Sequence, residues 1–481
     1  MLFWLNALIT TLSFFMLSSS FSSIKKTIDV LEKETDFQSA TFAMYAVSEK
    51  TGKILLDYQG EKSLLPNSII KVITTASALK GLKEDFSYTT RLVIHGDIQA
   101  GVLNGDLLII GGGDPTLGSD RFEGYQVLEK WVGWIKNEVI AEIKGDIIAD
   151  CSFFEKTLAP SSWLDEDVGN YYGAGACGLN FHDNAYAITF KLGSKVGDPA
   201  LISHLEPVVD GLHHINHVIM GQEGTGDRAV VFGGEYVKIQ TIRGTLPLGG
   251  STYTIRASIP NPAEFCAQQL KNTLEKKGVV VKGKVQVQMD PYSVKNPSRV
   301  NLHKSPLLSE IIDATNKASI NLYAESLLKT LGYVAKGEGS LVKGLEVVDS
   351  YLENLGVDTQ GWHLVDGSGL SSQNRMTAKG FVDFLLKIRQ ESYFPRLFHS
   401  LVSNKEDRAS TFKYLLVDPI LQGKLFIKTG YSSQGQSIGG FLINSLGDRI
   451  AFCIICNRFL GSFEKLQTKV KEILYKLESA E

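Results

Sequence analysis

The chain has 481 residues, of which 43% are hydrophobic and 21% are charged, and its formal net charge is −3. This length predicts about three domains, and the apolar fraction is typical of packed globular proteins rather than of disordered chains. The near-neutral balance gives no electrostatic reason to expect nucleic acid or an anionic membrane surface as a partner.

The chain begins with an apolar segment, Leu2–Met16, which is followed by a cluster of serines and only then by the first basic residue, Lys25. A short apolar run followed by small residues is the layout of a secretory signal peptide. We therefore expect residues 1–23 to be a signal peptide that exports the chain to the periplasm or another extracytoplasmic site of a bacterial envelope. An uncleaved N-terminal anchor is the alternative.

Strand patterns come next and are followed by one helix and a long β-rich region. Two alternating runs, Ala40–Val47 and Lys53–Tyr58, predict a β-hairpin. Apolar residues at helical spacing from Ile69 to Gly81 predict a helix. Between Tyr88 and Ser258 short β-like runs are separated by glycines, and only residues 125–138 have a helical pattern.

Helices dominate after this region, and the chain ends with three strands and a helix. The expected helices cover residues 263–276, 308–331, 340–355 and 377–388, and the expected strands cover 424–429, 438–443 and 449–456. Apolar residues on one face from Phe463 to Leu477 predict the terminal helix. The simplest architecture is one α+β domain that is split in sequence by a large β-rich insertion.

The first helix opens with Ser68-Ile69-Ile70-Lys71. A serine at a helix start lies near free backbone N–H groups and the positive end of the helix dipole, which favours an anionic intermediate. Lys71 lies one turn later on the same face and can take the serine's proton if burial or a neighbouring cation lowers its pKa. Taken alone, the pattern also fits an N-cap serine and a solvated lysine.

Two further short patterns offer compatible chemistry. Ser319-Ile320-Asn321 lies between two expected helices and supplies a hydroxyl and an amide, which suit a proton relay and a ligand for a substrate carbonyl. Lys428-Thr429-Gly430 ends a strand, where a lysine and a hydroxyl can bind a carboxylate and glycine lets a substrate backbone approach. In isolation these patterns fit a helix cap and an ordinary edge strand.

Together, Ser-x-x-Lys, Ser-x-Asn and Lys-Thr-Gly occur in this order and each in its expected structural context, which resembles the serine penicillin-recognising enzymes. The segment between the first two motifs is too long for a compact β-lactamase and contains the β-rich insertion. Four more segments strengthen the resemblance: Gly111–Leu117, Gly145–Asp150, Gly169–Ala174 and Asp366–Ser371. The whole layout resembles the low-molecular-mass class C penicillin-binding proteins, the D-alanyl-D-alanine carboxypeptidase/endopeptidase family.

The resemblance implies an α+β fold with a β-lactamase/transpeptidase-like catalytic domain, an antiparallel sheet flanked by helices, which is interrupted by a large β-rich insertion of one or two domains. The implied boundaries are 24–87 and 259–481 for the catalytic domain, 88–162 and 243–258 for the inserted domain, and 163–242 for a second nested domain.

The resemblance also implies a serine DD-peptidase that acts on peptidoglycan stem peptides ending in D-Ala-D-Ala, is acylated by β-lactam antibiotics, and needs no metal or other cofactor and no nucleic acid. The matching motifs imply four catalytic roles: Ser68 as nucleophile, Lys71 as its base, Ser319 as proton donor to the leaving group and Lys428 as electrostatic support. They imply that Asn321 binds the substrate amide, that Thr429 binds the terminal carboxylate, and that Gly430 and Tyr431 supply the strand backbone beside the substrate. The N–H groups of Ser68 and Tyr431 would form the oxyanion hole.

Three positions depart from the family pattern. Ile320 stands where relatives often have Asp or Asn, Tyr431 where Thr or Ser is common, and Ser372 where Arg is frequent. The last two departures bear on recognition of the substrate's carboxylate and of the stem peptide's third residue. Two alternative functions stay open, a serine β-lactamase and a non-catalytic cell-wall-binding homologue. The Glu-x-x-Leu-Asn element of class A β-lactamases is missing from the sequence, and all three catalytic motifs are complete.

One histidine cluster, His213–His217, has the spacing of a zinc-protease helix motif. His214 stands where that motif has its glutamate base. We therefore expect a surface loop or strand there rather than a metal site.

Overall fold

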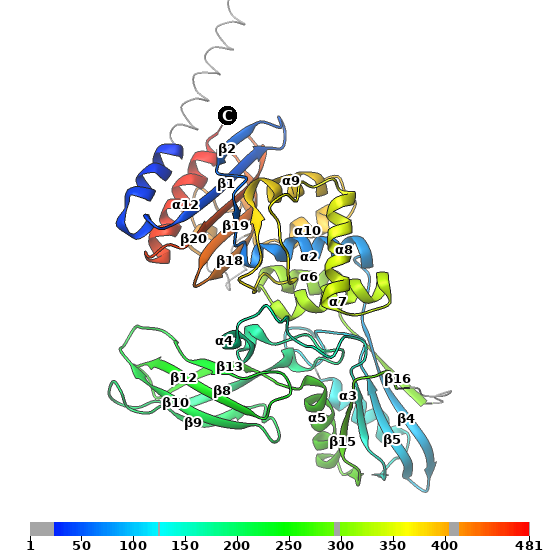
Figure 1. Ribbon diagram of the computed structural model, residues 1–481. Coiled ribbons are helices and arrows are strands. Elements are labelled where there is room, and N and C mark those ends of the chain that lie inside the picture. Colours follow the sequence, from blue (N-terminus) through cyan, green and yellow to red (C-terminus); the bar gives the residue numbers. More distant parts are fainter. Residues whose placement is uncertain (1–23, 124–125, 293–298, 404–412, 481) are drawn as a thin grey trace, which may run out of the picture. The chain divides into compact units, whose positions relative to one another are not determined.

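The computed structural model describes residues 24–123, 126–292, 299–403 and 413–480 (Figure 1). The expected signal peptide, residues 1–23, lies outside the described residues. Within the described ranges, no helix combines the length and apolar character needed to span a bilayer. The chain divides into two compact units: the first comprises the described residues up to Lys80, Ile312–Ser319 and the chain from Val348 onward, and the second comprises Gly81–Ile311 and Ile320–Val347.

The first unit is built on a five-stranded antiparallel sheet with the strand order β18-β19-β20-β1-β2. Its strands are β1 (Thr41–Ser48), β2 (Ile54–Tyr58), β18 (Leu425–Ser432), β19 (Gly435–Ile443) and β20 (Arg449–Asn457). The predicted hairpin and the three predicted C-terminal strands are confirmed, and β1 pairs with β20 along its full length. The first and last strands of the chain thus share one sheet.

Helices cover both faces of this sheet (Figure 1). They are a helix over residues 24–33, η1 (Thr35–Phe37), η2 (Asn67–Ile70), α2 (Lys71–Leu82), α9 (Ala378–Ile388), α10 (Phe394–Ser400), α11 (Lys413–Leu416) and α12 (Phe463–Glu478), while α6 (Leu308–Lys317) and α8 (Leu341–Asn354) each contribute residues to both units. A short ribbon, β3 (Ser63–Leu64) and β17 (Met376–Thr377), precedes η2 and α9 in the chain.

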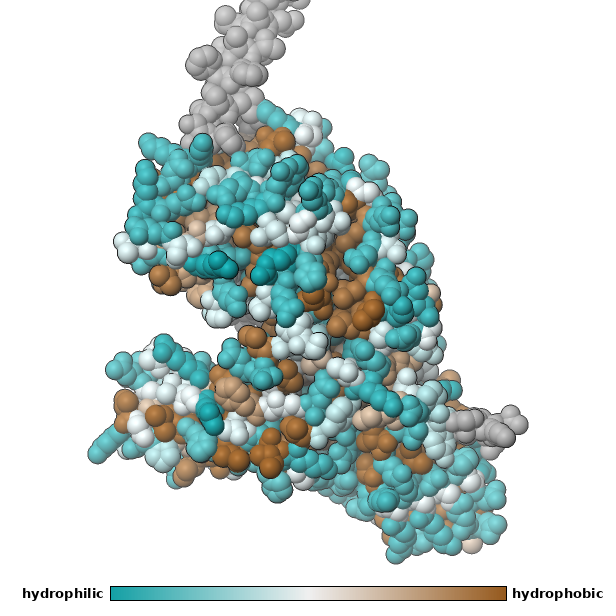
Figure 2. Space-filling model, in the orientation of Figure 1, coloured by the Kyte–Doolittle hydropathy of each residue, from teal (hydrophilic) through white to brown (hydrophobic). Residues whose placement is uncertain are grey.

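Apolar side chains on the two faces explain this packing. On one face, Leu466 and Val470 of α12 join Phe42 and Ile454 of the sheet in one buried cluster. Hydrophilic side chains cover most of the outer surface of this part of the first unit, as Figure 2 shows. On the other face α9 packs on β1 and β20. The predicted terminal helix and its apolar face are thereby confirmed.

The second unit contains one seven-stranded and two three-stranded sheets. The seven-stranded sheet contains β4 (Thr89–Gln99), β5 (Val102–Ile110), β6 (Glu142–Ile143), β7 (Ile147–Asp150), β14 (Val280–Val281), β15 (Val285–Gln288) and β16 (Arg299–Lys304). One three-stranded sheet contains β8 (Ala185–Lys191), β9 (Leu201–Glu206) and β13 (Thr252–Ser258). The other three-stranded sheet contains β10 (His213–Gly221), β11 (Val230–Phe232) and β12 (Ile239–Pro247). The helices are α3 (Val127–Asn137), α4 (Asp165–Val168), η3 (Tyr171–Gly173), η4 (His182–Asn184), α5 (Pro262–Lys276) and α7 (Asn321–Lys336). The histidine cluster lies on β10, a strand as expected.

Strand pairing in the second unit differs from the expected boundaries. We expected β13 to belong with residues 88–162, but it pairs with β8. We expected residues after 259 to return to the catalytic domain, but β16 pairs with β4. Both pairings join strands far apart in sequence, and no local pattern encodes such a partner. The division into one catalytic and two inserted domains that fold and act separately stays a prediction.

The helical region expected over residues 308–331 consists of two helices. α6 ends at Lys317 and α7 begins at Asn321, so Ser319 lies between two helices, as its motif required. Ser319 has φ 55°, in the left-handed region that residues other than glycine rarely adopt. A left-handed residue just past a helix end turns the chain sharply, which explains why the helix stops here.

Candidate active site

Ser68 and Lys71 lie next to each other in space as well as in sequence. Ser68 lies inside the 3-10 turn η2, and Lys71 is the first residue of α2, so Ser68 is not the N-cap of the alternative interpretation. Lys71 Nζ is 3.0 Å from Ser68 Oγ, a hydrogen-bond distance. The Lys71 side chain is fully buried, which excludes the alternative of a solvated lysine.

The turn that carries Ser68 is held in a strained conformation by the sheet. Asn67, just before Ser68, has φ 51°. Its side-chain amide donates to the carbonyl of Gly435 at 3.2 Å, and Ser437 Oγ donates to the carbonyl of Pro66. A strained residue persists only where its surroundings over-determine it, and these contacts with β19 do so. They fix the direction in which Ser68 points.

Gly430 lets strand β18 approach the nucleophile's backbone. A Cβ placed on Gly430 would lie 2.7 Å from the backbone nitrogen of Ser68 and 2.4 Å from Ser437 Oγ. Such distances are too short for real side-chain contacts, so only glycine permits this packing. The glycine of the Lys-Thr-Gly motif thus brings the Ser68 N–H group close to β18.

A loop from Asp366 to Ser371 supplies a contact that the sequence patterns did not reveal. Lys71 Nζ donates to the carbonyl oxygen of Ser368 at 2.6 Å. The buried Asp366 carboxylate shapes this loop, because it accepts two of the loop's backbone N–H groups at 2.7 Å each and Asn374 Nδ2 at 2.9 Å. A backbone carbonyl has no residue-type signature; the available signal was the Asp-Gly-Ser-Gly turn sequence itself.

Lys428 reaches Ser319 from the end of β18. Its Nζ donates to Ser319 Oγ at 2.8 Å and to the carbonyl of Thr429 at 2.8 Å. Lys428 is 1% exposed. Burial, and secondarily the positive charge of Lys71, hold the pKa of the Lys428 ammonium well below its usual value. The structure therefore brings Ser68, Lys71, Ser319 and Lys428 into the first unit as two hydrogen-bonded serine–lysine pairs whose lysines repel each other.

A model of the family described as D-Ala-D-Ala carboxypeptidase 3 (S13) matches residues 24–476. The chain belongs to this family. It is 27% identical over 458 residues to a D-alanyl-D-alanine carboxypeptidase of Actinomadura sp. strain R39, covering 92% of this chain and 82% of that one. It is 24% identical over 477 residues to the D-alanyl-D-alanine carboxypeptidase DacB of Haemophilus influenzae, covering 97% and 96%.

The fold agrees with the family assignment. The crystal structure of penicillin binding protein 4 (dacB) from Haemophilus influenzae superposes with a TM-score of 0.81 at 22% identity, covering 95% of this chain and 99% of that chain. The predicted family, the predicted α+β fold and the predicted enzyme class, a serine-type D-Ala-D-Ala carboxypeptidase, are confirmed.

The remaining residues that we expected in this S13 site lie on two different elements. Thr429 is almost fully buried on β18 between Lys428 and Gly430, and Tyr431, 52% exposed, places its ring centroid 4.4 Å from that of Phe463. Asn321 opens α7 in the second unit, where its side-chain amide donates to the carbonyl of Tyr172 at 2.7 Å. Asn321 therefore has a partner in its own unit.

Proposed function

We propose that this S13-family chain cleaves peptidoglycan stem peptides ending in D-Ala-D-Ala through an acyl-enzyme on Ser68, and that β-lactams acylate the same serine. The observation that carries the proposal is the contact at 3.0 Å between Ser68 Oγ and the fully buried Nζ of Lys71. A buried amine within hydrogen-bond distance of a hydroxyl can remove its proton as the oxygen attacks a carbonyl.

In the first step Lys71 takes the proton of Ser68 while Oγ attacks the carbonyl carbon of the penultimate D-Ala. The hydrogen bond from Lys71 to the Ser368 carbonyl supports this role, because it orients the amine. The N–H groups of Ser68 and Tyr431 hold the oxyanion. The close approach of Gly430 to the Ser68 nitrogen supports this assignment, since Tyr431 is the next residue along β18.

In the second step the leaving D-Ala nitrogen takes a proton from Ser319. Lys428 is hydrogen-bonded to Ser319 Oγ at 2.8 Å, so it can restore that proton. The lowered pKa of Lys428 makes this exchange easier near neutral pH. Water then hydrolyses the acyl-enzyme. Thr429 binds the terminal carboxylate and Asn321 the substrate amide in this scheme.

The partners and the cellular site belong to the same proposal. The Haemophilus influenzae penicillin binding protein 4 has also been solved in a complex with a β-lactam. We infer from this relative that β-lactams bind the present chain. The apolar N-terminal segment supports export to the periplasm, where peptidoglycan is found.

Labelling with benzylpenicillin tests the proposal. The purified chain should form a stable one-to-one adduct that intact-mass spectrometry detects and peptide mapping places on Ser68, and Ser68→Ala should form none. Ser77→Ala is the matched control, because Ser77 is a buried serine of α2 whose hydroxyl donates to the Ile73 carbonyl of the same helix at 2.8 Å. It should label like the wild type.

Each alternative function gives a different result in the same assay. Rapid loss of the adduct with release of hydrolysed penicillin would identify a β-lactamase. No adduct at all would identify a non-catalytic homologue. An adduct on another serine in Ser68→Ala would refute Ser68 as the nucleophile.

A further inference from the structure

Asn316 is a buried amide between three helices of the first unit. It lies in the last turn of α6, three residues before Ser319, and is fully buried. Its Nδ2 donates to Ser400 Oγ on α10 at 2.8 Å and to Thr75 Oγ1 on α2 at 3.2 Å. One side chain thus links the helix that leads to Ser319 to two others.

Thr75 continues this link to the proposed base. Its hydroxyl donates to the backbone carbonyl of Lys71 at 2.7 Å, one turn earlier on α2. Because the hydroxyl proton is used there, Thr75 Oγ1 receives the Asn316 amide as an acceptor. Ser400 is arranged in the same way: its hydroxyl donates to the Leu397 carbonyl at 2.6 Å and accepts from Asn316. The orientation of the amide is therefore determined on both sides.

We propose that Asn316 is a positioning residue for the reaction, and that its amide, acting through Thr75, holds Ser319 at the correct distance from Lys71. The inference rests on the proposed roles of Ser319 and Lys71. Asn316 touches neither the substrate nor the reacting atoms.

The conformation of Ser319 explains why such a link is needed. With φ 55°, Ser319 is held in a backbone state that serine adopts only under constraint. The hydrogen bond from Lys428 constrains its side chain, but the helix before it must also be held in place. A small shift of α6 against α2 would move the proton donor without unfolding the chain, and a misplacement of about 1 Å can cost about 100-fold in rate.

The test compares two substrates that differ only in the leaving group: an acyl-D-alanyl-D-alanine peptide, whose scissile bond is an amide, and the matching thioester. An amine must be protonated as it leaves, whereas a thiolate leaves without a proton. Ser319→Ala should therefore lower kcat/KM for the amide about 100-fold more than for the thioester. If Asn316 positions Ser319, Asn316→Leu and Thr75→Val should reproduce this selective loss at about 10-fold.

Two further variants complete the design. Thr75→Ser restores the hydroxyl and should restore the amide-to-thioester ratio. Ser77→Ala removes a buried hydroxyl of the same helix that donates to a carbonyl within α2, and it should leave the ratio unchanged. Melting temperatures measured alongside separate loss of fold from loss of ratio.

The outcomes are distinguishable. If Asn316→Leu and Thr75→Val lower both substrates equally, or lower only the melting temperature, the amide is merely structural and the inference is overturned. If Ser319→Ala itself leaves the ratio unchanged, the proposed role of Ser319 is wrong and the inference fails with it. A selective loss in both variants, restored by Thr75→Ser, supports it.

Discussion

Each unit buries a lysine to the same extent, but the surroundings of the two lysines are opposite. Lys329 on α7 of the second unit and Lys428 on β18 of the first unit are both 1% exposed. Lys329 Nζ forms an ion pair with Glu155 at 3.3 Å and donates to the carbonyls of Thr157 at 2.7 Å and Leu158 at 3.2 Å. Its charge is thus neutralised and its donors are satisfied.

Lys428 donates two hydrogen bonds but has no counter-ion within the described part of the chain. Among the residues that the structure describes, no carboxylate lies within ion-pair distance of its Nζ, and its charged neighbour is another cation, Lys71. A buried ammonium without a counter-ion costs free energy, whereas removing one partner of an existing buried pair destabilises the fold because the other charge is left uncompensated. Burial alone therefore does not make a lysine chemically useful; burial without an opposite charge does.

Replacing the unpaired lysine should have the largest effect, and that effect should be on activity. Lys428→Met should lower the rate of acylation by benzylpenicillin about 10³-fold, because Ser319 loses the group that supports its proton transfer. The same variant should unfold at an equal or higher denaturant concentration, because an uncompensated charge has been removed. Stopped-flow acylation and urea denaturation measure the two effects. A strongly destabilised variant would mean that Lys428 is a structural cation after all.

Lys329→Met should give the reverse pattern. It removes the counter-ion of the partly exposed Glu155 and leaves the carbonyls of Thr157 and Leu158 without their donor, which should cost about 1–3 kcal/mol of unfolding free energy. The acylation rate of the folded fraction should match the wild type, since Lys329 is not part of the Ser68 cluster. Lys343→Met is the control: its ion pair with Glu346 is on the surface, and the unfolding midpoint should not move. A slower acylation in folded Lys329→Met would contradict the separation.

The pH dependence of acylation sharpens the comparison further. Burial and the Lys71 charge lower the pKa of Lys428, so we expect the two lysines to titrate as a coupled pair and the acylation rate to rise with pH below the range of free lysine. In Lys428→Met the remaining ammonium at Lys71 loses its repulsive neighbour, which favours the protonated base. The profile should therefore move to higher pH.

Lys428→Arg is the matched control for this shift, because guanidinium keeps the positive charge. Its profile should stay near that of the wild type even if the rate falls. Lys71→Arg should acylate far more slowly at every pH, since arginine cannot give up its proton. A wild-type rate that is flat from pH 6 to pH 10 would remove the lysine pair as the titrating group.

Much of the first unit could be predicted because its signals are local. The strands expected over residues 424–429, 438–443 and 449–456 match β18, β19 and β20 to within a few residues, and the apolar stripe predicted α12. The helix expected over residues 377–388 is α9, and Thr377 caps it, since its hydroxyl accepts the N–H group of Gly380 at 3.1 Å. The three short motifs pointed to Ser68, Lys71, Ser319 and Lys428 because each needs a specific residue type.

What could not be predicted depends on groups or partners without a local signature. The carbonyl of Ser368 binds Lys71, but every residue has a carbonyl, and only the fold selects this one. The pairing of β16 with β4 joins segments about two hundred residues apart, and their alternating patterns fit many partners. The left-handed conformation of Asn67 and Ser319 is imposed by tertiary contacts rather than by their own preferences.

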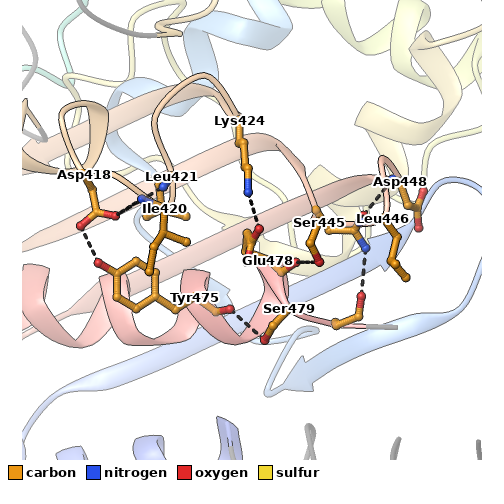
Figure 3. A network of polar contacts seen from close by, with 12 residues as sticks. Asp418, Ile420, Leu421, Lys424, Ser445, Leu446, Asp448, Tyr475, Glu478 and Ser479 are labelled. Atoms are coloured by element: carbon orange, nitrogen blue, oxygen red, sulfur yellow. Dashed lines mark hydrogen bonds and ion pairs between the residues drawn. The ribbon is translucent and has the colours of Figure 1, made fainter.

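The smallest expected effect concerns a polar network that anchors the start of β18 to α12, drawn in Figure 3. Asp418 is buried and accepts Lys471 Nζ at 2.8 Å, the Tyr475 hydroxyl, and the N–H groups of Ile420 at 3.0 Å and Leu421 at 3.3 Å. Burial opposes ionisation of Asp418, but the hydrogen bonds from Lys471, Tyr475 and the backbone outweigh it and lower the pKa of the carboxyl.

Unlike Lys428, Asp418 has its counter-charge, so we expect its removal to affect stability and not chemistry. A carboxyl whose pKa is lowered by folding stabilises the folded state above its unfolded pKa near 3.8, and this contribution is lost as the pH falls through the lower folded pKa. Asp418→Asn should therefore lower the unfolding free energy by about 1–2 kcal/mol at pH 7, and the difference from the wild type should shrink below pH 3.8.

The control is Glu472→Gln, which breaks the half-exposed pair with Lys469 on the same helix and should leave the unfolding free energy unchanged at both pH values. Urea midpoints at pH 7 and pH 3 decide the matter: an equal loss at both would mean that Asp418 acts through its shape rather than its charge. A lower acylation rate in folded Asp418→Asn would mean that the network also sets the position of Lys428, which lies ten residues later on β18.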